Sequence, residues 1–406
     1  MALPTMRVRV GFNQDTFELD DPVRGVLNTS KLGGTTTFTD VTNKVLSLSV
    51  DRGRSRDINA FQAGSCNFEL DNLDARYDPT NSSGAYYGGI EPLMEVIVDA
   101  TTDSGTTYYP LFTGFVTDWN INYPNSADST VSVACSDAFM KLANTALTST
   151  SVSSALTGAF ITEILDEPTV KFSPDRSIET GNSTMASQTI SANTLNAIQT
   201  AEFSEQGAVF IAKDGTFTFK QRHSTFPSTS SATFSDDGSD LSYTRMDQTL
   251  ADELLYNYVS MKRNSGTAQV SENSASQSKF LLRELTKTGL YNNSDTDVKD
   301  ISNHILAKYD EVEPRFNKVN VDLNDLSTAQ QVTVLDLEVI DIIKVEITPV
   351  GTSSQVSRYS IIDGISWSVT PSTQTVVFST SDTTDAQFLR LNSSLFGVLD
   401  TDKLGY

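Results

Sequence analysis

The sequence predicts a mainly β protein with α/β insertions, an α+β chain in which two barrel-like antiparallel β domains flank smaller helix-containing domains. Three observations lead to this class. Stretches of alternating apolar and polar residues, separated by turn-rich connectors, dominate the beginning and the later part of the chain. Stretches with helical spacing of apolar residues occupy the middle. Two of the β stretches also present the same features in the same order.

The first 143 residues are rich in alternating stretches typical of strands. Strands that follow one another this closely, joined by turn residues, indicate an antiparallel sandwich or barrel. We therefore assign residues 1–143 to an N-terminal β-barrel domain. The alternating stretches are RVRVGF, VLSLSVDRG, GSCNFELDN, LMEVIVDA, YPLFTGFVTDWNI and STVSVACSDA.

Residues 144–240 change to an α/β pattern of two helices and a hairpin. Apolar residues at helical spacing predict one helix within 154–167 and a second within 191–207. The stretch AVFIAKDGTFTFKQR follows, and its Asp214-Gly215 pair is a strong signal for a tight hairpin turn. These elements together predict a small α/β domain.

The later part of the chain returns to β patterning. Residues 241–275 and 315–380 are assigned to a second β-barrel domain, and residues 276–314 to a helical insertion within it. The insertion holds the strongest helix of the chain, within Ser294–Pro314, because its apolar residues recur at helical spacing up to a proline. Residues 381–406 are assigned to a C-terminal extension.

The stretches Leu93–Asp137 and Ile342–Asp382 look alike. Each has an alternating strand, a turn-rich connector, a glycine, a tryptophan-bearing strand, a proline-containing loop and a final strand. The shared residues are Gly114 and Trp119 in the first stretch and Gly364 and Trp367 in the second. Two unrelated β meanders with similar turns remain the alternative. If the repeat is real, three copies of the chain would place six similar barrels around one axis.

Charge and hydropathy exclude several classes of partner. The chain has 51 acidic and 29 basic residues, a net charge of -22 and a pI near 4.4. This excess argues against attraction to nucleic acid or to anionic membranes, since phosphate binding rests on lysine and arginine. No stretch approaches the roughly 18 apolar residues of a membrane span. The start of the sequence shows no apolar signal core, so we expect a protein kept in a cytosol or released by lysis.

Few residues suit catalysis or metal binding. Cys66 and Cys135 lie in apolar alternating contexts, which favours buried free thiols over a disulfide. His223 and His304 are far apart in sequence, and His304 falls on the predicted helix. Zinc sites and histidine-based triads usually need more than this. Nothing marks one pair of carboxylates as glycosidase-like, although such a pair stays open. We expect no enzyme, no cofactor and no metal.

The stretch LDNLDARYDPTNSSGAYYGG concentrates oxygen ligands and could bind calcium. The spacing of Asp71, Asp74 and Asp78 is three and then four, which misses the alternate-residue pattern of helix-loop-helix calcium sites. Arg76 lies among these acids and can neutralise them by bidentate pairing. Pro79 fixes the backbone direction after Asp78. We therefore interpret the stretch as a structural loop that leaves a strand, with calcium binding as the alternative.

Four stretches together resemble the tail hub and minor tail proteins of long-tailed bacteriophages, a baseplate-hub-like family. The most specific runs from an Arg-Gly-Arg segment to the Asp-Asn…Asp-x-Arg-x-Asp-Pro loop in FTDVTNKVLSLSVDRGRSRDINAFQAGSCNFELDNLDARYDPTN. The others are YPLFTGFVTDW, EQGAVFIAKDGTFTFKQR and FLRLNSSLFGVLDTDKLGY. The residues singled out as a structural signature are Asp71, Asp74, Arg76, Asp78, Pro79, Gly114, Trp119, Gly364 and Trp367.

The resemblance implies a structural virion protein. Three copies would form a ring-like hub that caps the tail tube, adapts its six-fold symmetry to a three-fold tip and lets DNA pass without specific binding. Implied partners are distal tail or tube ring proteins, the tape measure protein and tip or fibre proteins. The implied location is the virion tail tip or baseplate, after assembly in the host cytoplasm.

Two alternatives to the hub remain. One is a distal tail ring or another tail adaptor protein. The other is a carbohydrate-binding or hydrolysing tail component, for which tyrosines would supply an aromatic surface. Paired tyrosines in β-rich loops are more often packing residues. The tyrosines concerned are Tyr86, Tyr87, Tyr108 and Tyr109.

Overall fold

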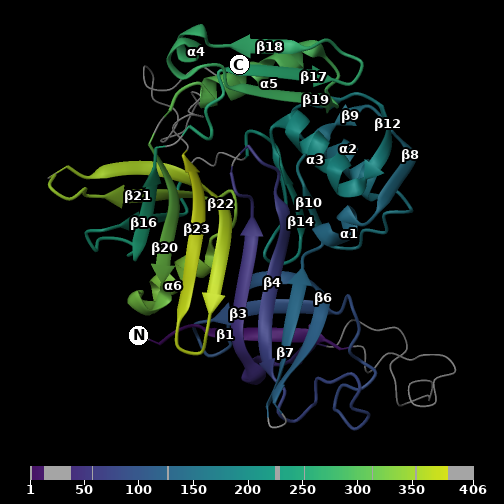
Figure 1. Cartoon of the computed structure of the whole chain (residues 1–406), viewed down its shortest axis with the longest axis vertical. Helices are drawn as coiled ribbons and strands as arrows, with labels where there is room; N and C mark the ends of the chain where they lie inside the picture. The colour runs from purple at the N-terminus through teal and green to yellow at the C-terminus, as the bar shows by residue number, and fades with distance from the viewer. Residues whose placement is uncertain are drawn as a thin grey trace.

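A computed structural model describes residues 2–12, 38–56, 58–125, 128–224, 229–250, 252–312, 314–352 and 354–382. Most regular structure in this part of the chain is strand, and most helices fall between two strand-rich stretches in sequence order. In space, these helices lie beside and above the large sheet (Figure 1). The predicted α+β class, mainly β with helical insertions, is confirmed. The predicted extension 381–406 lies almost entirely outside the described residues.

Thirteen of the described strands form one large sheet. Its main path runs β16-β20-β23-β22-β3-β4-β7-β6-β5-β1-β2, and β21 pairs with β22 and with β15. The strands are β1 (Thr5–Gly11), β2 (Phe38–Asp40), β3 (Val45–Gly53), β4 (Gln62–Asp71), β5 (Glu95–Thr101), β6 (Tyr109–Asn125), β7 (Asp128–Ser136), β15 (Ala232–Ser235), β16 (Arg245–Thr249), β20 (Arg315–Asp322), β21 (Ile342–Ile347), β22 (Val356–Val369) and β23 (Gln374–Asp382).

Alternation along these strands builds the core. In β1 and β7 every second residue is buried, because successive side chains of a strand point to opposite faces of the sheet. Val8 and Val10 of β1 are almost fully buried, as are Val96 and Val98 of the neighbouring β5. The alternation in the sequence therefore places the apolar side chains of these strands on one face of the sheet.

The two predicted β domains are hydrogen-bonded to each other. β22 pairs antiparallel with β3, with Gly364 opposite Gly53 and Trp367 opposite Val50. Within the described part of the chain, the strand path stays open, and no pairing closes either half into a barrel. The closed barrels expected from the sequence are therefore not seen, and the two halves are joined edge to edge instead.

The predicted repeat corresponds to two antiparallel meanders, β5-β6-β7 and β21-β22-β23. In both, a long central strand pairs with a shorter strand before it and another after it. The position of the glycine in the pairing differs between them. In the first meander, Gly114 lies opposite Val96 of the preceding strand. In the second, Gly364 lies beyond the part of β22 that pairs with the preceding strand, which ends at Ile361. The likeness holds for strand order and not for the position of the glycine.

An α/β region lies beside the large sheet (Figure 1). Its two predicted helices are present, and the side chain of Asn193 caps the second by accepting from the backbone N–H of Asn196. The Asp214-Gly215 hairpin is confirmed by antiparallel pairing of β13 with β14. The elements are α1 (Phe139–Ala143), β8 (Ala146–Val152), β9 (Ala155–Leu156), α2 (Thr157–Leu165), β10 (Arg176–Ile178), β11 (Thr184–Met185), β12 (Gln188–Asn193), α3 (Thr194–Glu205), β13 (Ala208–Ile211) and β14 (Phe217–Lys220).

A third region forms a small sheet covered by a helix at one end of the molecule (Figure 1). The central strand β17 (Tyr258–Arg263) pairs with β18 (Gln269–Glu272) and β19 (Glu284–Leu290). The helices are α4 (Ser274–Phe280) and α5 (Asp295–Tyr309), and the side chain of Ser294 caps α5 by accepting from the backbone N–H of Asp297. β17 thus differs from its expected grouping with the second β domain, because it packs on α5 around a separate apolar core.

The helix α6 (Thr328–Asp336) departs from the predicted pattern. The sequence predicts β structure throughout 315–380, but α6 interrupts that stretch. Ser327 and Gln330 form a capping box at its start, which satisfies free backbone N–H groups of the first turn. Across the described residues, none of the helices is both long and apolar enough to span a membrane.

Candidate functional site

The two β halves meet at a junction made by Arg52, Gly53 and Arg54 at the end of β3 and by Asp363 and Gly364 in β22. We call this set the β3–β22 junction. Here β22 changes its partner along one edge, pairing with β21 up to Ile361 and with β3 from Gly364 onward. The register against β23 on the other edge also shifts between Ile362 and Gly364. Such a bulge redirects a strand and displaces one residue from the ladder.

Asp363, the displaced residue, holds the junction together. Its carboxylate is almost fully buried, and Oδ1 accepts a hydrogen bond from Nε of Arg54 at 2.8 Å. Ser381 donates its hydroxyl to the other carboxylate oxygen. The backbone N–H of Arg54 also donates to the carbonyl of Asp363 at 2.8 Å. Arg54 and Asp363 thus form a buried ion pair, and a backbone hydrogen bond joins the same two residues. Removing one of the two charged side chains would take away the buried charge partner of the other.

Arg52 ties the junction to the α/β region. Its guanidinium donates to Oε1 of Glu338 at 2.6 Å and to the carbonyl of Ile211 at 3.1 Å. The other oxygen of Glu338 accepts from the backbone N–H of Lys213 at 2.9 Å. Nζ of Lys213 in turn donates to the carbonyl of Asp336 at 2.6 Å, at the C-terminal end of α6. Three regions of the chain therefore meet at the Arg-Gly-Arg segment.

Glycine is required where the two strands approach most closely. Gly53 has a φ of +119°, and a Cβ placed there would lie 2.2 Å from the carbonyl oxygen of Asp363. At Gly364 a Cβ would lie 3.2 Å from the carbonyl oxygen of Arg52, which is a tight contact. Gly114 is also confined, with a Cβ 2.5 Å from the carbonyl oxygen of Ser136. The signature residues chosen from the sequence include Gly364 and Gly114, whereas Gly53 entered as the middle of the Arg-Gly-Arg segment.

The Asp71–Asp78 loop leaves the opposite end of β4, far from the junction. Lys44 donates to Asp71 at 2.8 Å and lies 3.6 Å from Asp74. Arg76 donates from Nε to Asp74 at 2.7 Å. The hydrogen bond from Lys44 lowers the pKa of Asp71. The cation that bridges two carboxylates is therefore Lys44, which sequence reasoning missed, while Arg76 pairs with Asp74 alone among the three aspartates.

Asp78 has different partners. The hydroxyl of Tyr123 donates to Oδ2 at 2.5 Å, and the backbone N–H of Thr80 donates to Oδ1 at 2.8 Å. These bonds lower the pKa of Asp78. Pro79 is exposed in the turn that follows. The three carboxylates of the loop are thus each engaged by neighbouring donors.

Aromatic packing fixes this loop on the sheet. Trp119 of β6 donates its indole N–H to the carbonyl of Tyr77 at 3.0 Å. The Tyr77 ring stacks on Tyr86 with 5.4 Å between centroids, and Tyr86 stacks on Phe12 at 4.1 Å. Tyr86 is a packing residue, in line with the expectation for paired tyrosines, whereas Tyr87 is 53% exposed. Trp119 and the loop therefore form one unit.

In the described part of the chain, no three His, Cys, Asp or Glu side chains are placed to share an ion. The carboxylates of the loop instead pair with cations and hydroxyls, as described above. This arrangement favours the structural interpretation of the loop. The loop is separate from Gly364, which belongs to the β3–β22 junction, and from Trp367, which lies opposite Val50 further along β22.

The remaining candidate residues are two cysteines and two histidines. Cys66 and Cys135 lie opposite each other on β4 and β7, and both are buried free thiols, as expected. Burial raises the pKa of the Cys66 thiol, which keeps it protonated and unreactive. His304 lies on α5 as predicted, and His223 lies in the turn after β14.

Known proteins share this architecture. No family model and no curated protein matches the sequence. A 43 kDa tail protein of prophage MuSo2 from Shewanella oneidensis superposes with a TM-score of 0.58 at 12% identity, over 95% of this chain and 99% of that one. A tail protein from Neisseria meningitidis MC58 gives 0.58 at 11%, over 94% and 98%. The chain has the phage tail protein fold.

This phage tail protein fold extends over nearly all of the chain and of both solved structures. The resemblance predicted from short sequence stretches is confirmed at the level of the fold. The identities are low, so the shared property is the arrangement of strands and helices. In this chain, the β3–β22 junction is the place where the two strand-rich halves become one sheet.

Proposed function

We propose that this chain is a structural component of a phage-type tail, and specifically a ring-forming hub protein that caps the tail tube. The single observation that carries the proposal is the presence of two similar antiparallel meanders in one continuous sheet, fused at the β3–β22 junction. A chain with two such units can present two comparable surfaces to a ring of single-unit subunits. Three copies would then match a six-fold partner while keeping a three-fold tip.

The junction suits a rigid ring. Backbone pairing, a buried ion pair and the network around Arg52 hold the two halves at a fixed orientation. Within the described part of the chain, the end strands β2 and β16 each have a neighbour on one side only, and contact with neighbouring copies would cover the other edge. Rigidity within the chain and pairing between chains are what a closed ring requires.

The acidic charge suits a DNA conduit. A formal charge of -22 on each copy repels phosphate, so DNA would pass through a lumen without specific binding. The proposed partners are distal tail or tube ring proteins, the tape measure protein and tip or fibre proteins. The proposed location is the tail tip or baseplate of a virion, after assembly in the host cytoplasm. The role needs no catalytic group.

The test is the symmetry of the assembled protein. Purified chain should sediment as a trimer over a broad concentration range, and negative-stain images should show a ring with three-fold symmetry. Native mass measurement of the same sample gives an independent count of the copies. Rings with six copies would favour the distal tail ring alternative. A stable monomer at all concentrations, with or without a purified tube ring protein, would overturn the hub proposal.

A further inference from the structure

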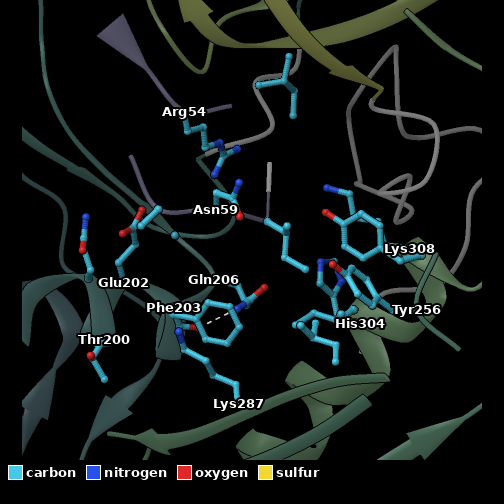
Figure 2. Close-up of a pocket in the computed structure, with 18 of the residues that line it drawn as sticks. Arg54, Asn59, Thr200, Glu202, Phe203, Gln206, Tyr256, Lys287, His304 and Lys308 are labelled. Atoms are coloured by element: carbon cyan, nitrogen blue, oxygen red, sulfur yellow. Dashed lines mark hydrogen bonds between the residues drawn. The ribbon is translucent and has the colours of Figure 1, made fainter. Parts of the chain in front are cut away.

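A cavity of about 550 Å³ lies where the α/β region, the large sheet and the third region meet (Figure 2). Its walls come from α3, from the segment after β3, and from β19 and α5 of the third region. Arg54 and Glu202 lie on one side, with His304 and Lys308 across the cavity from them (Figure 2). This volume falls within the usual range of ligand pockets, which is roughly 300–1,000 Å³.

The lining is cationic although the chain is strongly acidic. Lys287 and Lys308 contribute two positive side chains, beside His304 and beside Arg54, whose charge is already paired with Asp363. Glu202 is the one carboxylate among the lining residues of the described chain. The chain overall has 51 acidic and 29 basic residues, so a pocket lined by more cations than carboxylates has the opposite charge balance to the rest of the protein. A ligand that carries negative charge fits it.

Glu202 adds a second requirement. Its side chain is only 4% exposed, and Oε1 accepts from the backbone N–H of Val209 at 3.0 Å. Among the residues that the structure describes, none donates a hydrogen bond to Oε2. A buried polar atom without a partner is costly, so a ligand whose backbone offers an N–H donor to the carboxylate, or a carbonyl acceptor to the protonated carboxyl, would recover that cost.

The remaining walls are largely apolar or aromatic. They include Phe203, Tyr256, Leu285, Ile305 and Tyr309. Nζ of Lys287 lies 5.1 Å from the centroid of the Phe203 ring, which places a cation and an aromatic face together. The pocket thus combines cations, a buried carboxyl group and an apolar surface.

We propose that this pocket binds an extended acidic peptide segment with at least one apolar side chain, contributed by a partner protein. Backbone N–H and C=O groups of a peptide suit Glu202 in either protonation state, its carboxylates suit the lysines, and its apolar side chain suits the aromatic wall. Inorganic phosphate could pair with the cations of the pocket but would make no contact with its apolar wall. Nucleic acid is disfavoured, because the net negative charge of the chain repels a long polyanion.

The inference that an acidic peptide binds depends only on the pocket of a single chain. The inference that this peptide belongs to another tail subunit rests on the proposed function. The two proposals therefore fail separately. A chain that forms no ring can still bind the peptide, and a ring can form from a chain whose pocket binds nothing.

The test is fluorescence anisotropy with a labelled acidic peptide of sequence DFELDE on the full chain. Comparison probes are the basic peptide KFKLKK, inorganic phosphate and a short oligothymidylate. The variant pair Lys287→Gln and Lys308→Gln removes two cations from the pocket without adding charge. Lys262→Gln is the matched control, because Lys262 is an exposed lysine of β17 in the same region and does not line the pocket.

We expect saturable binding of DFELDE, no binding of KFKLKK, and weakening of the acidic peptide by about tenfold in the double variant. Lys262→Gln should leave the affinity within about twofold. Circular dichroism and unchanged melting would show that the double variant is folded. The proposal is overturned if oligothymidylate or phosphate competes as well as the peptide, if no probe binds, or if the control weakens binding as much as the double variant.

Discussion

Nε of Arg54 lies 2.8 Å from Oδ1 of Asp363, although the two residues are 309 positions apart in the chain. The pair joins the end of β3 to the bulge of β22, and both side chains are nearly excluded from solvent. It therefore makes a long-range connection between the two β halves. The residues at and around this pair allow separate tests of the buried charge of Asp363, of the close backbone approach at Gly53 and of the ionisation of Glu202.

Replacement of Asp363 by alanine should lower the free energy of unfolding by about 3–5 kcal/mol, because the buried guanidinium of Arg54 would lose its counter-charge. Urea denaturation measures this change. The matched control is Asp247→Ala, which breaks the pair with the exposed Arg245 and should cost about 0–1 kcal/mol. Equal losses in the two variants would show that the junction pair adds nothing special to the stability.

Gly53→Ala tests the close approach of the strands. Its positive φ and the 2.2 Å contact with the Asp363 carbonyl both oppose a methyl group. Gly351→Ala is the matched control, since Gly351 has a φ of +86° and open space around the added atom. The control should cost about 1 kcal/mol from backbone strain alone. Thermal or urea unfolding should show a clearly larger loss for Gly53→Ala, and a similar loss in both would refute the steric explanation.

Glu202 should make stability depend on pH. Burial raises the pKa of this carboxyl from 4.5 to about 7. Between these values the folded chain keeps a proton that the unfolded chain releases, so the contribution of Glu202 to stability falls as the pH rises and levels off above 7. The shift corresponds to about 3 kcal/mol.

The measurement compares wild type with Glu202→Gln by urea unfolding at about pH 5, 6, 7 and 8. The stability of the variant relative to wild type should rise with pH up to about 7 and then stay constant. Glu311→Gln serves as the control for removing an exposed carboxylate. A difference between Glu202→Gln and wild type that stays the same at every pH would exclude a raised pKa at this position.

Calcium should leave the melting temperature unchanged. Asp71, Asp74 and Asp78 already accept hydrogen bonds from Lys44, Arg76 and Tyr123, respectively. A ligand that binds only the folded state raises its stability, so melting curves with calcium and with a chelator test this directly. A rise of several degrees with calcium, lost in Asp78→Asn, would restore the metal interpretation of the loop.

The two thiols should be unreactive in the folded chain. Cys66 and Cys135 are buried opposite each other, and only protein unfolded in urea should react fully with a disulfide reagent. Because antiparallel partners lie at a distance that a disulfide can span, oxidation during refolding should produce a cross-link that lowers the mass by two hydrogens. Fast reaction of both thiols in native protein would contradict their burial.

The sequence alone determined the local elements. Period-two alternation predicts the strands, helical spacing predicts α2, α3 and α5, and Asp214-Gly215 predicts its hairpin, because these signals depend on neighbouring residues. The same signals do not predict α6, since residues 328–336 lie within a stretch whose pattern favours β structure. The residues of the Asp71–Asp78 loop indicate a structural role, but they do not reveal its partner Lys44.

Only the tertiary structure decided how those elements combine. The pairing of Gly364 with Gly53, the contact of Arg54 with Asp363 and the pocket around Glu202 each join residues far apart in the chain. Alternation specifies which face of a strand is buried, but an exposed strand edge can accept many partners. The choice of β3 as the partner of β22 depends on close packing at two glycines and on one buried charge pair, and these are properties of the assembled fold.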